Sequence, residues 1–363
     1  MTLVPVPAGS DQVANRQVHE LSSGVDALYL SGHAPLPDAL VARLEEGRQV
    51  AADLGPVEFE LGGVSWRLRS TGRQKFRFVL TSEMGWVGLT NSKALPTVWV
   101  QPKAELLHAL GPADAALAFT DPIESALGHV PWKVARIDLQ SDWQGMNLHR
   151  DLSESFVGRA RARNIYEDGD LCTGFTFGTG KGGGIYGRIY NKTAQIEVKG
   201  GDYWFDIWGD RYDPSLPVHR VEFQWGRAAL RSMQLTTPSK VLAAVGDLWR
   251  ESTHAWLTLR TPTGDQTKSR WPLAEWWEAV QRSALCHELL GIARLKDSSR
   301  IGALRLLMPL LNGCVASAAV HLSTDDIEGT LAALVLPLRD YERISGMPFG
   351  LRVDTKRRDR EAT

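Results

Sequence analysis

The sequence predicts an α+β fold in which helices pack on one side of a largely antiparallel central sheet, with a helical region towards the C-terminal end. Two observations lead to this prediction. Short segments in which apolar and polar residues alternate, the pattern of a strand, come in blocks together with helical segments. From about residue 238 onward, apolar residues recur every three to four positions, the pattern of a helix. With 363 residues, of which 43% are hydrophobic and 23% charged, the chain is long enough for one large or two compact domains.

The first block of strands and helices occupies residues 21–118. A helix is predicted at 37–54, where Leu40 and Leu44 fall on one side at helical spacing. A second helix is predicted to end at Gly111, a residue type that commonly follows a helix. Strands are predicted at 25–30, 57–61, 64–69, 75–80, 86–89 and 97–100.

The second block, residues 130–235, repeats this order. It has a predicted strand at 133–142, a helix at 152–164, strands at 173–177, 186–191 and 219–225, and a helix from about 228. The two blocks share their pattern without clear residue identity. The central domain, residues 21–235, is therefore either an internal duplication of two similar halves or one continuous arrangement.

The chain that follows the central domain is predicted to be helical from 236 to 350. Helices are predicted at 241–253, 273–295, 301–320 and 325–341. In the third of these, Leu304, Leu307, Met308 and Leu311 have the spacing of a face that packs on a core. Residues 1–20 are expected to form a mobile lead, and residues 351–363 a solvated tail.

Composition indicates the cellular compartment of the protein and limits its possible partners. Cys172, Cys286 and Cys314 lie far apart and lack the spacing of a metal site or a disulfide framework, which suits a reducing cytoplasm. No apolar run approaches the roughly 18 residues of a membrane span, and the first residues lack the pattern of a signal peptide. We therefore expect a cytoplasmic protein that does not engage a membrane. Its 41 basic and 42 acidic residues give a net charge of −1, so any nucleic-acid contact must come from a local patch.

Three of the predicted strands carry apolar residues on one face and polar residues on the other, because alternate residues of a strand share a face. The polar faces hold Arg136, Asp138, Gln140 and Asp142 in the first strand, Arg188, Tyr190 and Lys192 in the second, and Arg220, Glu222 and Gln224 in the third. An antiparallel sheet with one face in water gives the same pattern in any single strand. If the three strands are neighbours, however, their acids converge near the tyrosine.

These residue types suit phosphodiester chemistry. The candidate metal ligands are Asp138, Asp142 and Glu222. Their hard carboxylate oxygens are the ligands that Mg²⁺ or Mn²⁺ prefers, and the metal would polarise a phosphate. A phenol has a pKa near 10, so Tyr190 needs nearby positive charge, from Arg188, Lys192 or the metal, to act as a nucleophile at neutral pH. A covalent phosphotyrosine would conserve the bond energy for rejoining, which is the chemistry of DNA nicking and strand transfer.

The motifs on these strands resemble those of the plasmid rolling-circle initiators called Rep_trans and of related conjugative relaxases. The resemblance is carried by Arg136-Ile-Asp-Leu, by Gly174-Phe-Thr-Phe-Gly leading into Arg188-Ile-Tyr-Asn-Lys, and by Arg220-Val-Glu-Phe. It covers about residues 130–230 and is looser before them. The chain departs from the family in having Gln195 where an acid often follows the tyrosine motif, the first acid being Glu197.

The resemblance implies a role for each site residue. Tyr190 corresponds to the nucleophile that becomes joined to the 5′ phosphate. Asp138 and Glu222 correspond to the acids that hold the divalent metal, and Asp142 to a further acid after the first strand. The implied partners are single-stranded or hairpin origin DNA, a host helicase and a second copy of the chain. Plasmid or phage replication is not separated from conjugative transfer.

Several basic residues are candidates for contacts with the DNA backbone, which would not read sequence. They are Arg159, Arg161, Arg163, Lys181 and Arg220. The first three lie at the end of the helix predicted at 152–164, and a solvated helix face would have the same composition. The glycine-rich segment 178–184 fails the phosphate-loop pattern, because Gly182 follows Lys181 where Ser or Thr should stand. It is better explained as a hairpin whose lysine can still reach DNA.

The sequence therefore predicts an enzyme, a metal-dependent DNA nicking-closing endonuclease that initiates rolling-circle replication or transfer. Two alternatives remain open. One is a non-catalytic DNA-binding regulator of a mobile element with the same fold. The other is a hydrolytic nuclease in which the metal activates water and Tyr190 only packs.

Overall fold

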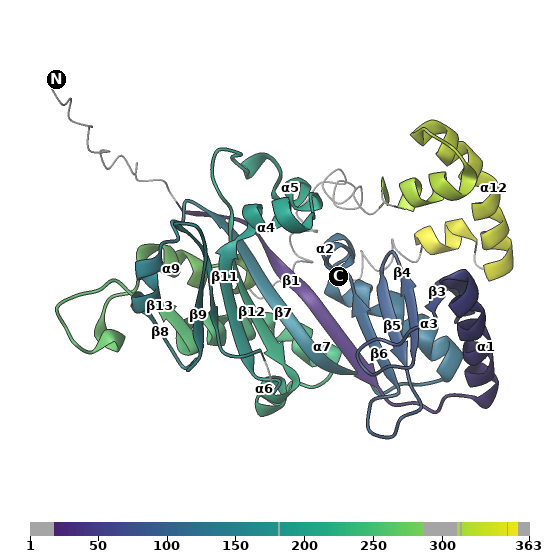
Figure 1. The fold of residues 1–363 in the computed structure, drawn as a ribbon, viewed down its shortest axis with the longest axis horizontal. Coiled ribbons are helices and arrows are strands. Elements are labelled where there is room, and N and C mark those ends of the chain that lie inside the picture. The colour runs from purple at the N-terminus through teal and green to yellow at the C-terminus, as the bar shows by residue number, and fades with distance from the viewer. Residues whose placement is uncertain (1–17, 181, 287–310, 313, 347, 355–363) are drawn as a thin grey trace. The chain divides into compact units, whose positions relative to one another are not determined.

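The computed structural model describes residues 18–180, 182–286, 311–312, 314–346 and 348–354 (Figure 1). The fold is α+β, as the sequence predicts, and the strand pairs whose register is described are antiparallel. The chain divides into two compact units, each assembled from segments far apart in sequence. Unit 1 consists of residues 1–24, 138–225 and 244–290, and unit 2 of residues 25–137, 226–243 and 291–363. In the described part of the chain, no helix has the length and apolar character needed to span a bilayer.

Unit 2 is a row of antiparallel strands with helices against one face. Its elements are β1 (His19–Gly32, from Val25), α1 (Asp38–Leu54), β2 (Val57–Leu61), β3 (Val64–Arg69), β4 (Phe78–Ser82), β5 (Gly85–Leu89), β6 (Val98–Pro102), α2 (Ala104–Leu110), α3 (Pro112–Leu127), α6 (Arg227–Ser232), α7 (Pro238–Ala243) and α12 (Ile327–Ser345). The strands lie in the order β2-β3-β4-β5-β6-β1. The Trp66 ring of β3 packs 5.6 Å from Phe119 of α3, and α1 packs on β2 and β3.

Unit 1 holds the second row of strands. Its elements are β7 (Lys133–Gln144, from Asp138), β8 (Phe156–Gly158), β9 (Arg163–Asp168), β10 (Leu171–Phe177), β11 (Ile185–Asn191), α4 (Lys192–Lys199), α5 (Tyr203–Trp208), β12 (His219–Gly226), α8 (Val245–Arg250), β13 (Leu257–Leu259) and α9 (Glu275–Gln281). The strands lie in the order β7-β12-β11-β10-β9, and β8 and β13 form a separate pair. The three strands with polar faces are therefore neighbours, in the order β7, β12, β11.

Several sequence predictions need correction. The helix predicted at 152–164 is absent: a 3-10 turn at Arg150–Ser155 leads into β8 and β9. Those strands pair with β13 and β10, so pairing with distant segments overrides the local helical pattern. The helix predicted at 241–253 is divided into α7, α8 and a wider π turn that runs directly into β13.

The predicted C-terminal helices are described only in part. Of the helix predicted at 273–295, the described residues contain α9 and a 3-10 turn at Ala284–Cys286. The helix predicted at 325–341 corresponds to α12. The stripe of Leu304, Leu307 and Met308, most of the lead and residues 355–363 of the tail lie outside the described residues, and residues 351–354 of the predicted tail are helical.

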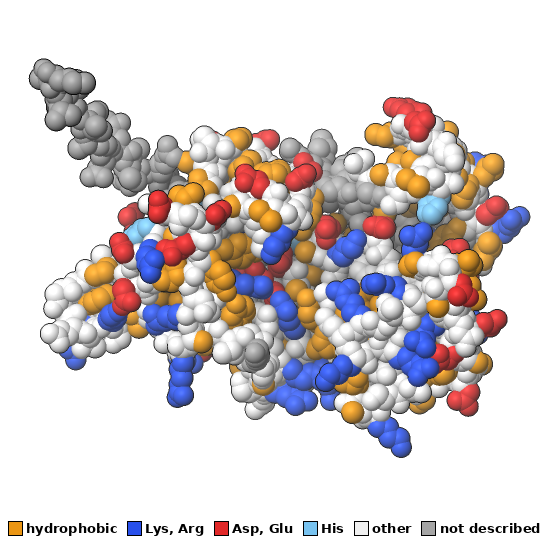
Figure 2. All heavy atoms as spheres, in the orientation of Figure 1, with side chains coloured by type: hydrophobic (Ala, Val, Ile, Leu, Met, Phe, Trp, Pro, Cys, Tyr) orange, Lys and Arg blue, Asp and Glu red, His pale blue; other side chains and the backbone are white. Residues whose placement is uncertain are grey.

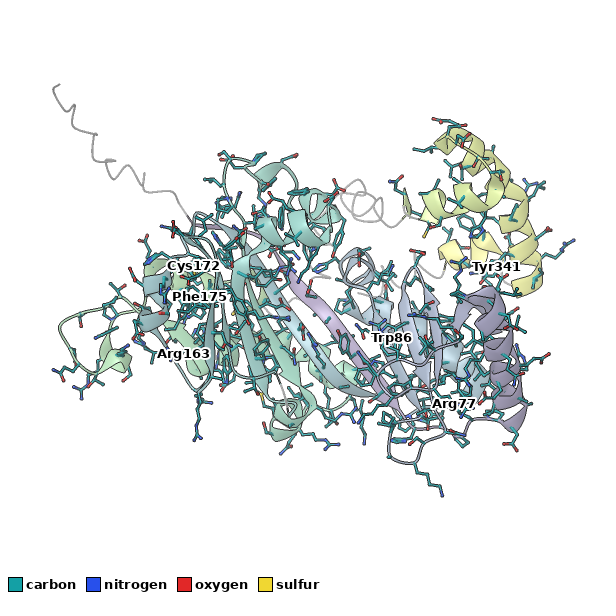
Figure 3. All side chains as sticks on the ribbon, viewed as in Figure 1. Arg77, Trp86, Arg163, Cys172, Phe175 and Tyr341 are labelled. Atoms are coloured by element: carbon teal, nitrogen blue, oxygen red, sulfur yellow. The ribbon has the colours of Figure 1, made fainter. Side chains whose placement is uncertain are left out.

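Both faces of the unit 1 sheet are covered. On one face the Phe156 ring of β8 lies 5.4 Å from Phe175 and 4.8 Å from Phe177, both on β10 (Phe175 is labelled in Figure 3). On the other face, Trp204 and Trp208 of α5 belong to a buried apolar cluster. The polar face of β7 is consequently buried as well, and every residue from 137 to 144 is shielded from water.

A buried ion pair ties β7 to β12. Arg220 Nε donates to Asp142 Oδ1 at 2.7 Å and Nη2 to Oδ2 at 2.8 Å, and both residues are 0% exposed. The same carboxylate accepts hydrogen bonds from Trp208 Nε1 (2.8 Å) and Ser22 Oγ (3.0 Å). The guanidinium lies 3.8 Å from the centre of the Trp204 ring. These contacts compensate for the loss of water around both charges. They also fix which residues of the two strands lie opposite each other.

We expect Arg220→Met to lower the free energy of unfolding by about 3–5 kcal/mol, because it leaves the Asp142 carboxylate buried without its counter-ion. Urea denaturation followed by tryptophan fluorescence measures the change. The double variant Asp142→Leu with Arg220→Met should recover a large part of the loss. A loss below about 1 kcal/mol for the single variant would show that the pair does not hold the strands together.

Candidate functional site

Strand pairing places the candidate site on one face of unit 1. Arg188 of β11 stands opposite Glu222 of β12, and Tyr190 stands opposite Arg220. On the other side of β11, Tyr190 stands opposite Gly174 of β10. Directly opposed residues of antiparallel strands share a face. The sequence-predicted tyrosine, arginine and acid are thus brought to one surface.

Two acids meet at one guanidinium. Arg188 Nη2 lies 3.1 Å from Asp138 Oδ2 of β7, and the same nitrogen donates to Glu222 Oε1. Asp138 is 1% and Glu222 3% exposed, whereas the Arg188 side chain is 29% exposed. Two buried carboxylates from separate strands therefore converge on a group that reaches solvent.

The phenol of Tyr190 joins this cluster. Its hydroxyl donates to Glu222 Oε2 at 3.1 Å, so Glu222 contacts Arg188 with one oxygen and Tyr190 with the other. Tyr190 is partly exposed. The nucleophile candidate is therefore in direct contact with a group able to accept its proton, and it remains accessible from outside.

Gly174 makes room for the backbone of Tyr190. A Cβ atom at Gly174 would lie 2.7 Å from the Ile189 carbonyl oxygen and 2.8 Å from Tyr190 Cβ. Any larger residue would have to push β11 away from β10. The glycine thus sets where the tyrosine stands.

The other sequence-predicted catalytic residue, Lys192, is placed differently. It is the first residue of α4 and is buried, with Nζ 2.8 Å from Gln195 Oε1 and 5.1 Å from the centre of the Trp204 ring. Asn191 caps the same helix by accepting a hydrogen bond from the Ala194 amide at 3.0 Å. These contacts assign Lys192 to the junction that carries β11 into α4.

The expected roles of Asp142 and Arg220 are corrected by their burial. Arg220 and Asp142 are both 0% exposed, and the Asp142 carboxylate is enclosed by Arg220, Trp208 and Ser22, whereas the partners of Glu222 reach solvent. Both residues are structural. The candidate metal ligands are therefore Asp138 and Glu222.

The predicted arginine cluster is not on a helix. Arg159 pairs with Glu251 at 2.9 Å, and Arg163 begins β9 and donates to the Phe156 carbonyl at 2.8 Å. Arg161 is exposed on the turn between them. Arg161 therefore keeps its place as a candidate for DNA contact, while its two neighbours are engaged with the protein. Lys181 lies outside the described residues.

Sequence reasoning left Gln140 out of the site. It is 0% exposed on β7, two residues from Asp138 and on the same face, and neither its Oε1 nor its Nε2 has a hydrogen-bond partner among the described residues. A buried amide normally finds partners. The alternation along β7 was the signal that could have identified it, because it lies between two acids of the same face.

The cluster fits a divalent cation. Mg²⁺ is usually held by one or two carboxylates, with water or substrate phosphate in the other positions. Asp138 and Glu222 supply two such groups already directed at one cationic atom. Among the described residues, no group of three or more His, Cys, Asp or Glu side chains assembles. An ion at this place would thus depend on these two carboxylates and on its substrate.

Comparisons with known proteins were made for the whole chain. No protein-family model matches it, and no curated protein matches it. One solved structure that is similar is the structure of a rolling circle replication initiator protein from Geobacillus stearothermophilus. The identity is 17% and the TM-score 0.43, over 73% of this chain and 97% of the other. A TM-score below 0.5 leaves the function to be inferred from the residues of the site.

His219 lies at the start of β12, and burial lowers its pKa to about 4. Its ring is neutral at pH 7, while an unfolded chain would protonate it below its ordinary pKa of about 6.5. The unfolded state therefore binds more protons between these values, and the protein should lose about 3 kcal/mol of stability from this group as the pH falls from 6.5 to 4. Urea unfolding of the wild type and of His219→Gln at pH 7 and pH 4.5 measures it. An equal pH dependence in the two proteins would contradict this assignment.

Replacing Gln140 with methionine should leave the protein at least as stable, and more stable by about 1 kcal/mol if the amide is unsatisfied in the folded state. The side chains are similar in size, and the apolar one has no polar group to desolvate. Denaturant unfolding measures the change, with Gln224→Met on β12 as a control at a partly exposed glutamine. A loss of more than about 1 kcal/mol would show that the Gln140 amide is bonded in the folded protein.

Proposed function

We propose that this chain is a DNA nickase of the rolling-circle initiator kind, in which Tyr190 attacks a phosphodiester and becomes joined to the 5′ phosphate. The observation that carries the proposal is the shared carboxylate of Glu222. It accepts the Tyr190 hydroxyl at 3.1 Å and, together with Asp138, contacts Arg188. The residues proposed as nucleophile, base and phosphate-binding cation thus belong to one hydrogen-bonded cluster.

The residues divide the reaction between them. The Tyr190 oxygen forms a bond to phosphorus as its proton passes to Glu222, and the bond from phosphorus to the 3′ oxygen breaks. The leaving oxygen takes up a proton and departs as a 3′ hydroxyl. The reverse reaction rejoins the strand without another energy source, because the tyrosyl ester retains the bond energy.

In this proposal Arg188 binds the reacting phosphate. Its guanidinium is the most exposed charged group of the cluster and offers several donors in a fixed plane. Charge-assisted hydrogen bonds from it would stabilise the negative charge that grows on the phosphate oxygens. Its contacts with Asp138 and Glu222 hold it beside Tyr190 before DNA binds.

A divalent cation, Mg²⁺ or Mn²⁺, is part of the proposal, with Asp138 and Glu222 as the residues that would hold it. When bound, it would supply a Lewis acid that polarises the phosphate. The proposed substrate is single-stranded DNA or a hairpin at an origin of replication or transfer, with a helicase and a second copy of the chain as further partners.

Tyr190→Phe should abolish the covalent protein–DNA adduct, by at least about 10³-fold, because the ring packs as before but lacks the attacking oxygen. The assay uses a pool of random-sequence, single-stranded oligonucleotides labelled at the 3′ end, with Mn²⁺ or Mg²⁺. The adduct is separated on a denaturing gel, and the 3′ label remains on the protein-linked fragment.

Tyr186→Phe is the matched control, because Tyr186 lies on the same strand and face, opposite Gln224, and phenylalanine keeps the ring that lies 5.7 Å from the Arg188 guanidinium. This variant should form the adduct as the wild type does. An adduct that persists in Tyr190→Phe would move the nucleophile elsewhere. Cleavage without any adduct in the wild type would support a hydrolytic nuclease, and binding without cleavage a regulator.

A further inference from the structure

We propose that unit 2 carries a second DNA-binding surface, which holds the phosphate backbone of duplex DNA. The surface is formed by six exposed basic residues on β3, on the loop between β3 and β4, and on the loop between β5 and β6. They are Arg67, Arg69, Arg73, Lys75, Arg77 and Lys93, and we call them the basic face. The inference rests on the proposed function in so far as DNA is the substrate.

The basic face is a local excess of charge in a chain that has none overall. Between residues 64 and 98 the six basic residues are accompanied by one acid, Glu83, whereas the whole chain has a net charge of −1. Figure 2 shows Lys and Arg side chains gathered over the part of the surface where Figure 1 places β3 to β6. The local patch that a nucleic-acid contact would require is therefore present.

The strand pattern explains why these cations share a face. Trp66 and Leu68 of β3 are buried on the side of the helices, so the alternating Arg67 and Arg69 point away from them. Pairing continues this face across the sheet. Arg67 is in register with Thr81, Trp86 and Gln101, and Arg69 with Val79, Gly88 and Trp99.

A cluster of packed, mostly aromatic side chains lies beneath the basic face. Phe76, Val79, Trp86 and Trp99 pack together there. The Phe76 ring fills the space above Gly88, where a Cβ atom would lie 2.6 Å from the ring, and it stands 5.9 Å from Trp99. The Arg73 guanidinium lies 4.7 Å from the centre of the Trp86 ring (Trp86 and Arg77 are labelled in Figure 3). Because Phe76 and Trp86 are buried, the groups left for a ligand are the cations.

The loop that carries Lys75 is held in a strained conformation. Arg73 and Phe76 exchange both backbone hydrogen bonds, at 3.1 and 2.9 Å, around a two-residue turn. Both turn residues, Gln74 (φ 51°) and Lys75 (φ 72°), have left-handed backbones that favour asparagine or glycine. Such strain persists where the surroundings impose it and is common at functional sites. Here the anchored Phe76 imposes it, and the result is an exposed lysine at a fixed tip.

Most of the basic face is not neutralised by the protein. Among the described residues, no ion pair includes Arg67, Arg69, Lys75 or Lys93, while Arg77 pairs with Glu45 of α1 at 2.6 Å. Several exposed cations on one face suit a ligand with repeated negative charges. Duplex DNA has the higher charge density of the two DNA forms, and contacts to its phosphates would be independent of sequence.

The test is the salt dependence of duplex binding. The variant Arg67→Gln, Arg69→Gln, Lys75→Gln should lower the affinity for a random-sequence hairpin duplex about tenfold or more at moderate salt. It should also reduce the slope of log affinity against log salt concentration by about 2 to 3, one unit for each lost phosphate contact. Fluorescence anisotropy of a labelled hairpin measures both. Lys75→Glu, a single change at the turn tip, should act in the same direction.

The matched control is Lys240→Gln, Arg339→Gln, Arg343→Gln, which removes the same three charges from exposed positions of unit 2 outside the basic face. Circular dichroism melting checks that all variants are folded. A slope change no larger than in the control, or an equal loss with a single-stranded oligonucleotide, would overturn the duplex assignment. The adduct assay is separate: a wild type that binds duplex but forms no adduct refutes the nickase, not the basic face.

Discussion

The burial of charged groups on one face of the unit 1 sheet is the constraint on which the site depends. A charge removed from water must be paired and hydrogen-bonded. Asp142 and Arg220 meet this demand as one carboxylate with one guanidinium, both oxygens occupied. In the second cluster, the carboxylates of Asp138 and Glu222 both contact a single nitrogen of Arg188. Two carboxylates held this close repel each other, so a further cation near them would be favourable.

The two charged clusters differ in exposure to solvent, and this difference suits one to a structural role and the other to chemistry. The enclosed pair fixes β7 against β12, and that alignment delivers Glu222 to Arg188 and Tyr190. The second cluster opens towards solvent through Arg188 and Tyr190. An arginine held by two buried acids beside an accessible phenol is suited to binding a phosphate, and Glu222 is suited to accepting a proton. A closed ion pair is suited only to holding strands.

The sequence predicts part of this arrangement. Alternation in β2, β3, β7, β11 and β12 identifies the strands and the residues that share a face, because the period of a strand is local. It does not separate Asp142 from Asp138, which have the same residue type, strand and face. What separates them is Trp208 and Ser22, which lie 66 and 120 residues from Asp142 in sequence and bond to it. The segment from 152 to 164 shows the same limit, since its strands exist only through pairing with β10 and β13.

Charge distribution resolves the apparent conflict between a net charge of −1 and the proposed DNA substrate. The basic surplus between residues 64 and 98 can be counted in the sequence. These basic residues form one surface because of the strand register and of a left-handed turn at Gln74 and Lys75. The residue types Gln and Lys do not predict such a turn. Acids elsewhere in the chain balance the surplus, and one of them, Glu58 of β2, stands opposite Arg67 on that face.

The most direct test of the central claim is to map the covalent attachment point. The wild-type adduct would be digested with nuclease and trypsin and analysed by mass spectrometry. Trypsin cuts after Arg188 and Lys192, so Tyr190 is released in a peptide of residues 189–192. A nucleotide remnant is expected on that peptide. A remnant on a peptide with another tyrosine, or a cut strand with no remnant on the protein, would contradict it.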